Sequence, residues 1–415
     1  MDLSAFFANI FRARKLVPVL FVAYLLTGLN SFIPNKLLGL PIRDVLGYAF
    51  LLMLAATCSV IAVQNTRAPK ILGWLTVSTI FFLTPVLQES WPLSASVKSY
   101  VSSVFLIASF VWINLSSHRD LVARFAALIV TLSALICLLD IAFPNGLTTT
   151  PGRAAGLYLN PNIAGGVLVL SATATYRFVA SEWRAAFLII VTSALIMTAS
   201  RASLATGIAV LGIAAMLSEN RKAPTAKALR NGGYALALTL LVSAFSVNQN
   251  PTVAGALQSQ YGSLLSVIAA PFRQPLSTTA GPSDKEGSLA AAAPIFSDSI
   301  HHRIFLYQQA SAVFKKQAGK GIGLDAARVL GPHNSYLLFG LAYGSLGLLI
   351  VPLGAVGVLL VGGVRKGFPA AIAVSGISLF SDDIFLTTSL VSAIGLMYVS
   401  VLPETAYLAR VRVRH

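Results

Sequence analysis

The sequence predicts an all-α polytopic membrane protein in which about twelve helices cross the bilayer. Hydrophobic residues make up 56% of the 415 residues, charged residues make up only 11%, and the mean hydropathy is +0.77. A soluble fold needs more polar surface than this composition supplies. The apolar residues also lie in runs of roughly 17 to 25 residues, the length that a helix needs to cross a membrane.

Twelve such runs follow one another along the chain. The first continues into Ile33 without a small-residue cleavage site, so we interpret it as a span and not as a removed signal. The tenth is overlong, and Gly344, Gly347 and Pro352 indicate that it begins with a tilted or partly separate segment. The expected spans are 16–33, 44–63, 70–87, 98–116, 121–143, 162–180, 184–200, 202–218, 232–247, 334–363, 367–380 and 384–402.

Basic residues indicate which side of the membrane each loop faces. The 30 Lys and Arg residues, against 14 Asp and Glu, lie in short clusters between the apolar runs, a pattern that favours topology signals over nucleic-acid binding. With the N-terminus in the cytoplasm, eighteen of them fall on the inner side and five in the short outer loops. Both termini are then cytoplasmic, and the long polar segment faces the periplasm if the source is a Gram-negative bacterium.

The chain divides into three parts. Residues 1–247 hold the first nine spans, residues 248–333 form the outer loop, and residues 334–415 hold the last three spans and a short basic tail. Within the loop, Ser297 or Asp298 can cap a helix near 298–318, because apolar residues recur there at helical spacing and lysines gather at its end. We expect this amphipathic helix to lie near the outer surface.

Two arginines on the outer face are candidates for binding an anion. Arg201 lies in a tight hairpin between helices of about 17 residues, or roughly 25 Å, which is shorter than the ~30 Å hydrocarbon core. A phosphate would stabilise its guanidinium there, whereas snorkelling from the hairpin is the simpler alternative. Arg303 lies in the early turns of the loop helix, where helix N-termini and arginines both favour phosphate; an ion pair with Asp298 is its alternative.

His333 ends the polar segment and begins the tenth span. Imidazole can accept a proton near neutral pH, so His333 suits a general base, and a loop histidine held by Asn334 is the alternative. Residues 152–162 contain Arg153 among glycines and asparagines and predict an ordered loop before the sixth span. Asp382 and Asp383 could orient an imidazole, pair with an arginine or mark a loop.

Several common chemistries lack their motifs in this sequence. It contains no nucleotide-binding loop, no Asp-x-Asp or His-x-x-x-His pattern for a metal, and no Gly-x-Ser-x-Gly elbow. The remaining arginines and base suit displacement of a phosphate or pyrophosphate without a metal or cofactor. A transporter of lipid-linked sugars and a binding or scaffolding protein stay open as alternatives. A transporter should carry ionisable groups near mid-membrane, and Asp140 is the only acid well inside a predicted span.

Four segments occur in the order found in the O-antigen ligase and O-antigen polymerase superfamily, which the chain resembles over residues 150–350. They are Gly152 to Asn162, Thr198 to Ser203, the long loop carrying Arg303, and the run Pro332-His333-Asn334-Ser335-Tyr336. The resemblance implies a largely twelve-span, GT-C-like glycosyltransferase of the bacterial inner membrane. Such an enzyme takes a glycan from undecaprenyl pyrophosphate on the periplasmic side and passes it to an acceptor hydroxyl.

The resemblance also implies roles for individual residues. Arg201 and Arg303 would hold the pyrophosphate, and His333 would deprotonate the attacking hydroxyl, with inversion because no carboxylate pair is present for a covalent intermediate. We favour ligation of O-antigen to lipid A core, with the polymerase as the alternative because it uses the same donor. Membrane lipids are the other expected partners, and the sequence does not indicate an oligomeric state. The remaining candidate substrate contacts are Arg153, Tyr158, Asn160, Asn162, Asn334, Tyr336, Asp382 and Asp383.

Overall fold

The computed structural model describes residues 19, 22–32, 119–142, 147–148, 150, 152–217, 226–249, 293–381, 384 and 387–401. Every regular element in these ranges is a helix. Two helical runs within them, Leu121–Ile141 and Ser335–Phe380, are long and apolar enough to cross a membrane, and Arg201–Met216 is a shorter apolar helix. The expected spans 44–63, 70–87 and 98–116 lie outside the described residues, as do Asp382 and Asp383.

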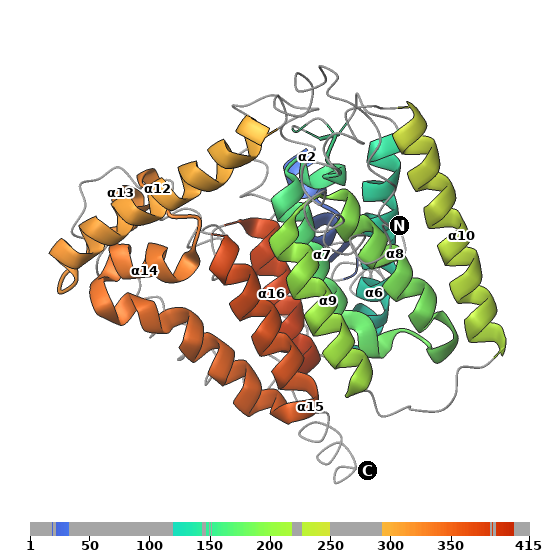
Figure 1. Ribbon diagram of the computed structural model, residues 1–415. Helices are drawn as coiled ribbons and strands as arrows, with labels where there is room; N and C mark the ends of the chain where they lie inside the picture. Colours follow the sequence, from blue (N-terminus) through green and yellow to red (C-terminus); the bar gives the residue numbers. More distant parts are fainter. Residues whose placement is uncertain are drawn as a thin grey trace, which may run out of the picture.

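Helices α6 to α10 form a bundle with α16, the last helix that the structure describes (Figure 1). Helices α6 to α9 begin and end close to the expected fifth to eighth spans, and α10 begins before the expected residue 232. The short helix α2 (Leu29–Phe32) lies inside the first expected span. The bundle helices are α6 (Arg119–Ala142), α7 (Pro161–Thr175), α8 (Arg184–Met197), α9 (Arg201–Met216), α10 (Ala226–Gln249) and α16 (Thr388–Val401).

The overlong tenth span is built from separate helical pieces, as its glycines predicted. Helix α14 (Ser335–Tyr343) ends at Gly344, whose φ of 72° favours glycine, and the 3₁₀ segment η7 (Gly344–Leu349) follows. The range labelled α15 (Ile350–Phe380) follows and contains two helices that meet at Gly363, where φ is 62° and ψ is −175°. Only glycine adopts this conformation readily. The break coincides with the expected end of the tenth span, so the tenth and eleventh expected spans are separate helices.

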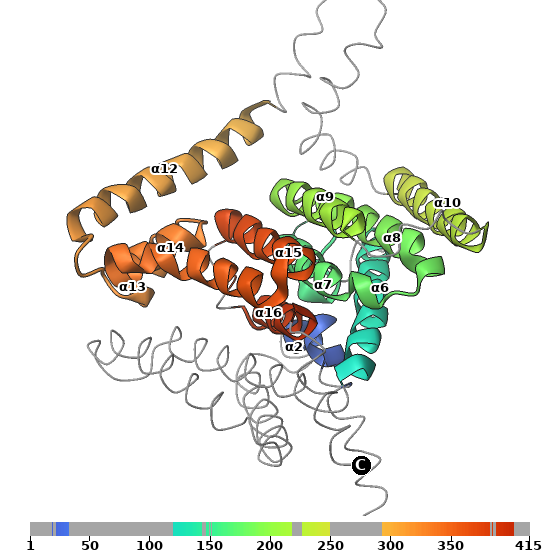
Figure 2. The same cartoon turned by 90° about the horizontal axis from the view of Figure 1, so that it is seen from below.

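A second group of helices lies to one side of the bundle (Figures 1 and 2). It contains α12 (Ala293–Gln317), α13 (Leu324–Val329) and α14, which share a small apolar cluster around Leu338. Ser297 and Asp298 lie inside α12, so the prediction that either residue caps this helix is wrong. The turn after α12 packs closely on α14, because a Cβ at Gly321 would lie 2.4 Å from the carbonyl oxygen of Ala342.

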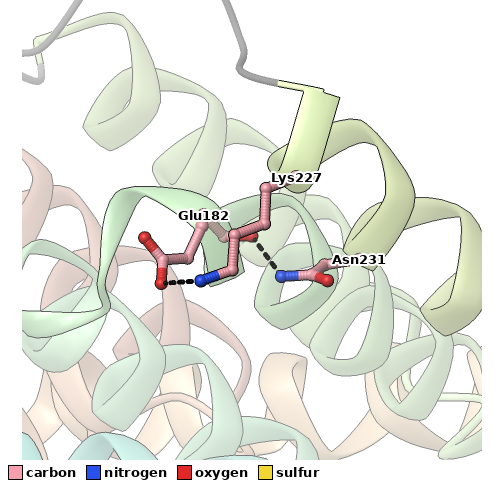
Figure 3. Close-up of polar contacts among 3 residues, drawn as sticks. All are labelled: Glu182, Lys227 and Asn231. Carbon is pink, nitrogen blue, oxygen red and sulfur yellow. Dashed lines mark hydrogen bonds and ion pairs between the residues drawn. The ribbon is translucent and has the colours of Figure 1, made fainter.

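The main apolar core is shared by α6, α7, α8, α9, α16 and the second half of α15. Helix α10 covers one edge of this core and is attached to the start of α8 by polar contacts (Figure 3). Lys227 pairs with Glu182 at 2.8 Å, and the Asn231 amide donates to the Glu182 carbonyl at 3.0 Å. An ion pair this exposed stabilises by at most about 1 kcal/mol, so apolar packing fixes α10.

Gly165 and Gly212 form a matched pair for testing the contact between α7 and α9. A Cβ at Gly165 would lie 2.7 Å from both Cβ and Oγ of Ser203, whereas no described atom lies within 4 Å of a Cβ at Gly212. Gly165→Ala should lower the free energy of unfolding by about 1–3 kcal/mol through overpacking. Gly212→Ala should be neutral or raise it by up to about 1 kcal/mol. Unfolding curves in detergent measure both, and equal effects would contradict this packing.

Candidate functional site

Residues 152–159 of the loop between α6 and α7 are buried or half-buried instead of lying on the surface. Ala154 and Ala155 are 0% exposed, and Tyr158 is 2% exposed. Gly152 and Gly156 turn the backbone with φ values of 76° and 54°. A buried loop cannot bond to water, so its backbone polar groups need partners within the protein.

Asp140 supplies two of those partners from the last turns of α6. Its Oδ2 accepts hydrogen bonds from the backbone N–H groups of Ala155 at 2.8 Å and Gly156 at 2.9 Å. The N–H of Ala154 donates to the carbonyl of Met197 at 2.8 Å. The loop is therefore fastened to the carboxyl ends of both α6 and α8.

Arg153 connects this loop to the turn between α8 and α9. Its Nε donates to the carbonyl of Thr198 at 2.9 Å, and its Nη2 donates to Oδ1 of Asn162 at 2.8 Å. The turn has a positive φ of 48° at Ala199, and α9 begins with the exposed Arg201. Arg153 and Arg201 thus share one end of the bundle.

Asn160 and Asn162 lie at the start of α7, at the same end of the bundle. Asn160 is the N-cap: its side chain accepts a hydrogen bond from the Asn162 N–H at 2.9 Å, and Pro161 occupies the first helical position. Both asparagine side chains are exposed, so they can meet a ligand as well as stabilise the helix.

His333 lies in the short segment between α13 and α14. Its side chain is exposed, and its φ of 50° is uncommon for a residue with a Cβ. Asn334 caps α14 by accepting a hydrogen bond from the Leu337 N–H at 3.1 Å. The buried hydroxyl of Ser335 donates to the carbonyl of Ser381, at the carboxyl end of α15. The backbone around His333 is thereby attached to the end of the eleventh expected span.

A chain of contacts brings His333 to the arginine end of the bundle. After Ser381 the chain reaches α16, whose Leu390 side chain would lie 2.8 Å from a Cβ at Gly166 near the start of α7. The Ser389 hydroxyl donates to the Asn30 side chain at 3.1 Å, so this end also includes the first expected span. The starts of α7, α9, α14 and α16 therefore lie together with the carboxyl end of α15.

The other predicted site residues are only partly described. Arg303 lies within α12, but its side chain is outside the described part of the structure, as are Asp382 and Asp383. Tyr336 lies half-buried in the first turn of α14. The structure therefore describes Arg153, Arg201 and His333 as the charged or titratable candidates at this end.

Tyr158, an expected substrate contact, has a structural role instead. Its hydroxyl donates to the carbonyl of Leu26, and its ring lies so close to Gly28 that a Cβ there would stand 2.8 Å from Cδ1. Burial raises the pKa of this hydroxyl, which therefore stays protonated and able to donate. Tyr158 joins the loop to the first expected span and does not reach the exposed surface.

Sequence reasoning missed the roles of Asp140 and Ser335. Asp140 had one available signal, because a lone acid in an apolar span is costly unless the structure uses it. Ser335 had none, because its acceptor is a backbone carbonyl 46 residues away in the chain.

Comparison of the chain with protein-family models, curated proteins and solved structures finds no match. Among the described residues, no three His, Cys, Asp or Glu side chains lie close enough together to hold a metal ion. The side chains at this end of the bundle indicate which reactions it could support. Guanidinium groups bind anions such as phosphates, and an imidazole accepts a proton.

Tyr158→Phe tests whether this tyrosine supports the loop. Removing the hydroxyl takes away one of two donors to the buried Leu26 carbonyl, which keeps its hydrogen bond from the Ser133 hydroxyl at 3.0 Å. The free energy of unfolding should therefore fall by about 0.5–1.5 kcal/mol, the net contribution of one hydrogen bond. Tyr234→Phe, at a tyrosine that is 68% exposed, should change it by less than about 0.5 kcal/mol. Detergent unfolding curves measure both variants, and a Tyr158→Phe protein as stable as the unmodified chain would contradict the role.

Proposed function

We propose that the protein is an O-antigen ligase of the bacterial inner membrane. It transfers O-antigen glycan from undecaprenyl pyrophosphate to a sugar hydroxyl of lipid A core, without a metal or other cofactor. The full chain crosses the membrane about twelve times in a GT-C-like arrangement, its termini are cytoplasmic, and its site faces the periplasm among membrane lipids.

The observation that carries the proposal is that Arg153 and Arg201 lie at one end of the helical bundle, and that the segment holding His333 is attached beside that end by the Ser335 hydrogen bond to Ser381. The two arginines and His333 come from three distant segments, and these are the segments in which the sequence resembles the O-antigen ligase and polymerase superfamily. Two guanidinium groups suit a pyrophosphate, and an exposed imidazole suits a hydroxyl that must lose a proton.

The proposed reaction needs three events at this end of the bundle. His333 removes the proton of the acceptor hydroxyl, and the hydroxyl oxygen attacks the anomeric carbon of the donor sugar. The bond from that carbon to the pyrophosphate oxygen breaks, and undecaprenyl pyrophosphate leaves with the bonding electrons. Arg201 and Arg303 offset the charge that develops on the leaving group. Direct displacement inverts the anomeric configuration, and a product with retained configuration would overturn this step.

The other end of the bundle differs in its polar groups. It holds Arg177, Arg184 and Lys227, and their residues belong to loops that the charge pattern assigns to the cytoplasm. Arg184 donates to the carbonyls of Val179 and Arg177, so it stabilises its own loop. A donor presented on the periplasmic side would meet the His333 end.

Replacing His333 with Asn gives a sharper test than replacing it with Ala. Asparagine tolerates a positive φ, so the substitution removes the imidazole without adding backbone strain. Loss of a general base should lower kcat by a factor of about 10²–10⁴ and leave the KM for the donor nearly unchanged. The assay is glycan transfer by purified protein from undecaprenyl-pyrophosphate-linked glycan to lipid A core.

The control is Tyr234→Phe on α10, at a tyrosine that is 68% exposed, which should keep the activity of the unmodified chain. Donor glycans that lengthen in the absence of lipid A core would identify a polymerase instead. If no covalent product forms with either acceptor, the protein is not this transferase, and transport or binding of the lipid-linked donor becomes the better explanation.

A further inference from the structure

We propose that Asp140 is a positioning residue for the bound pyrophosphate. Its carboxyl group holds the loop that fixes Arg153 against the turn before α9, and through this contact it sets the position of Arg201. The inference rests on the proposed function, because that function names the ligand.

The location of Asp140 requires an explanation. It is 2% exposed within α6, whose run Leu121–Ile141 is long and apolar enough to cross a membrane. Burying a carboxyl group in such surroundings is costly, and hydrogen bonds offset this cost only at Oδ2, because Oδ1 has no hydrogen-bond partner among the described residues. Both of the bonds to its Oδ2 come from consecutive backbone N–H groups of one loop, at 2.8 and 2.9 Å. Asp140 therefore fixes the path of that loop.

The loop residues that bond to Asp140 follow Arg153 closely in the sequence. The loop residue next to Ala155 is Ala154, whose N–H is bonded to the Met197 carbonyl at 2.8 Å. The residue before it is Arg153, whose Nε is bonded to the Thr198 carbonyl at 2.9 Å. A shift of the loop at Ala155 would therefore move the α8–α9 turn, and α9 begins only three residues after Thr198.

Two contacts fix the orientation of the Arg153 guanidinium. It donates to the carbonyl of Thr198 and to the amide oxygen of Asn162, which belong to two different helices' ends. Asp140 bonds to the backbone beside Arg153, so it positions the side chain that makes these contacts. A guanidinium held in a fixed orientation is preorganised for an anionic ligand.

The first measurement tests the hydrogen bonds between Asp140 and the loop, and it does not require the protein to transfer glycan. Asp140→Leu keeps a similar volume but no acceptor, and Asp140→Asn keeps one oxygen acceptor. Amide hydrogen exchange of the peptide covering 152–160 should speed up at least tenfold in Asp140→Leu and less in Asp140→Asn. Ser171→Ala is the control: the hydroxyl of Ser171 is buried without a hydrogen-bond partner among the described residues, so its removal should leave this exchange unchanged.

The second measurement is a double-mutant cycle on ligand binding. The dissociation constant of undecaprenyl pyrophosphate is measured for purified Asp140→Leu, Arg153→Ala and the double variant. Each single substitution should weaken binding about tenfold, the effect expected from losing one hydrogen bond to a charged group. Because Asp140 acts through Arg153, the double variant should bind no more weakly than Arg153→Ala alone. A residue that supported only the overall fold would instead give effects that multiply.

Three outcomes would overturn the inference: unchanged exchange in Asp140→Leu, multiplying effects in the cycle, or no binding of undecaprenyl pyrophosphate to the unmodified protein. Asp140→Asn guards against a trivial loss of folding in Asp140→Leu, because its effect on the exchange of residues 152–160 must be intermediate. Binding that follows the expected cycle without any glycan transfer would support the role of Asp140 and refute the ligase.

Discussion

The positions of Arg153 and Arg201 depend on the burial of residues 152–159 in the loop between α6 and α7. Its backbone N–H groups cannot reach water, and the surrounding helices are apolar. Asp140 and the Met197 carbonyl accept hydrogen bonds from three of these groups in succession, at Ala154, Ala155 and Gly156. Each bond gives a buried N–H group its acceptor and also sets the distance of the loop from a neighbouring helix. The hydrogen bonding of the loop backbone therefore determines the position of Arg153.

Close approach between helices makes these bonds possible. Gly165 brings α7 against Ser203 of α9, and Gly166 brings α7 against Leu390 of α16, with no room for a side chain at either position. Small residues serve this purpose in membrane helices, where apolar side chains gain little by leaving lipid. The helices around the loop are therefore held by backbone proximity and hydrogen bonds, and both depend on residues that carry no chemistry of their own.

Sequence alone predicted the features that local pattern determines. The lengths and apolar runs of α6 to α9 required no tertiary information, and Gly344 correctly marked the end of α14. The start of α12 was wrong, because Ser297 and Asp298 are good caps in isolation and nothing local shows that the helix extends beyond them. The roles of Tyr158 and Asp140 depend on partners at Leu26 and Ala155, whose proximity only the folded chain creates. The break at Gly363 lies where the apolar pattern ended the tenth expected span, because glycine permits the positive φ found there.

The proposed displacement requires the base and the arginines to be separated. In an inverting transfer the acceptor oxygen approaches the anomeric carbon from the side opposite the leaving group. The base and the phosphate-binding cations should then stand on opposite sides of the sugar and need not share a helix. His333 belongs to the group formed by α12, α13 and α14, whereas Arg153 and Arg201 belong to the bundle. The Ser335 hydrogen bond to the Ser381 carbonyl joins the two groups beside His333. A ligase and a polymerase would share this geometry, so the choice of acceptor must depend on residues around the sugar hydroxyl and not on the arginines.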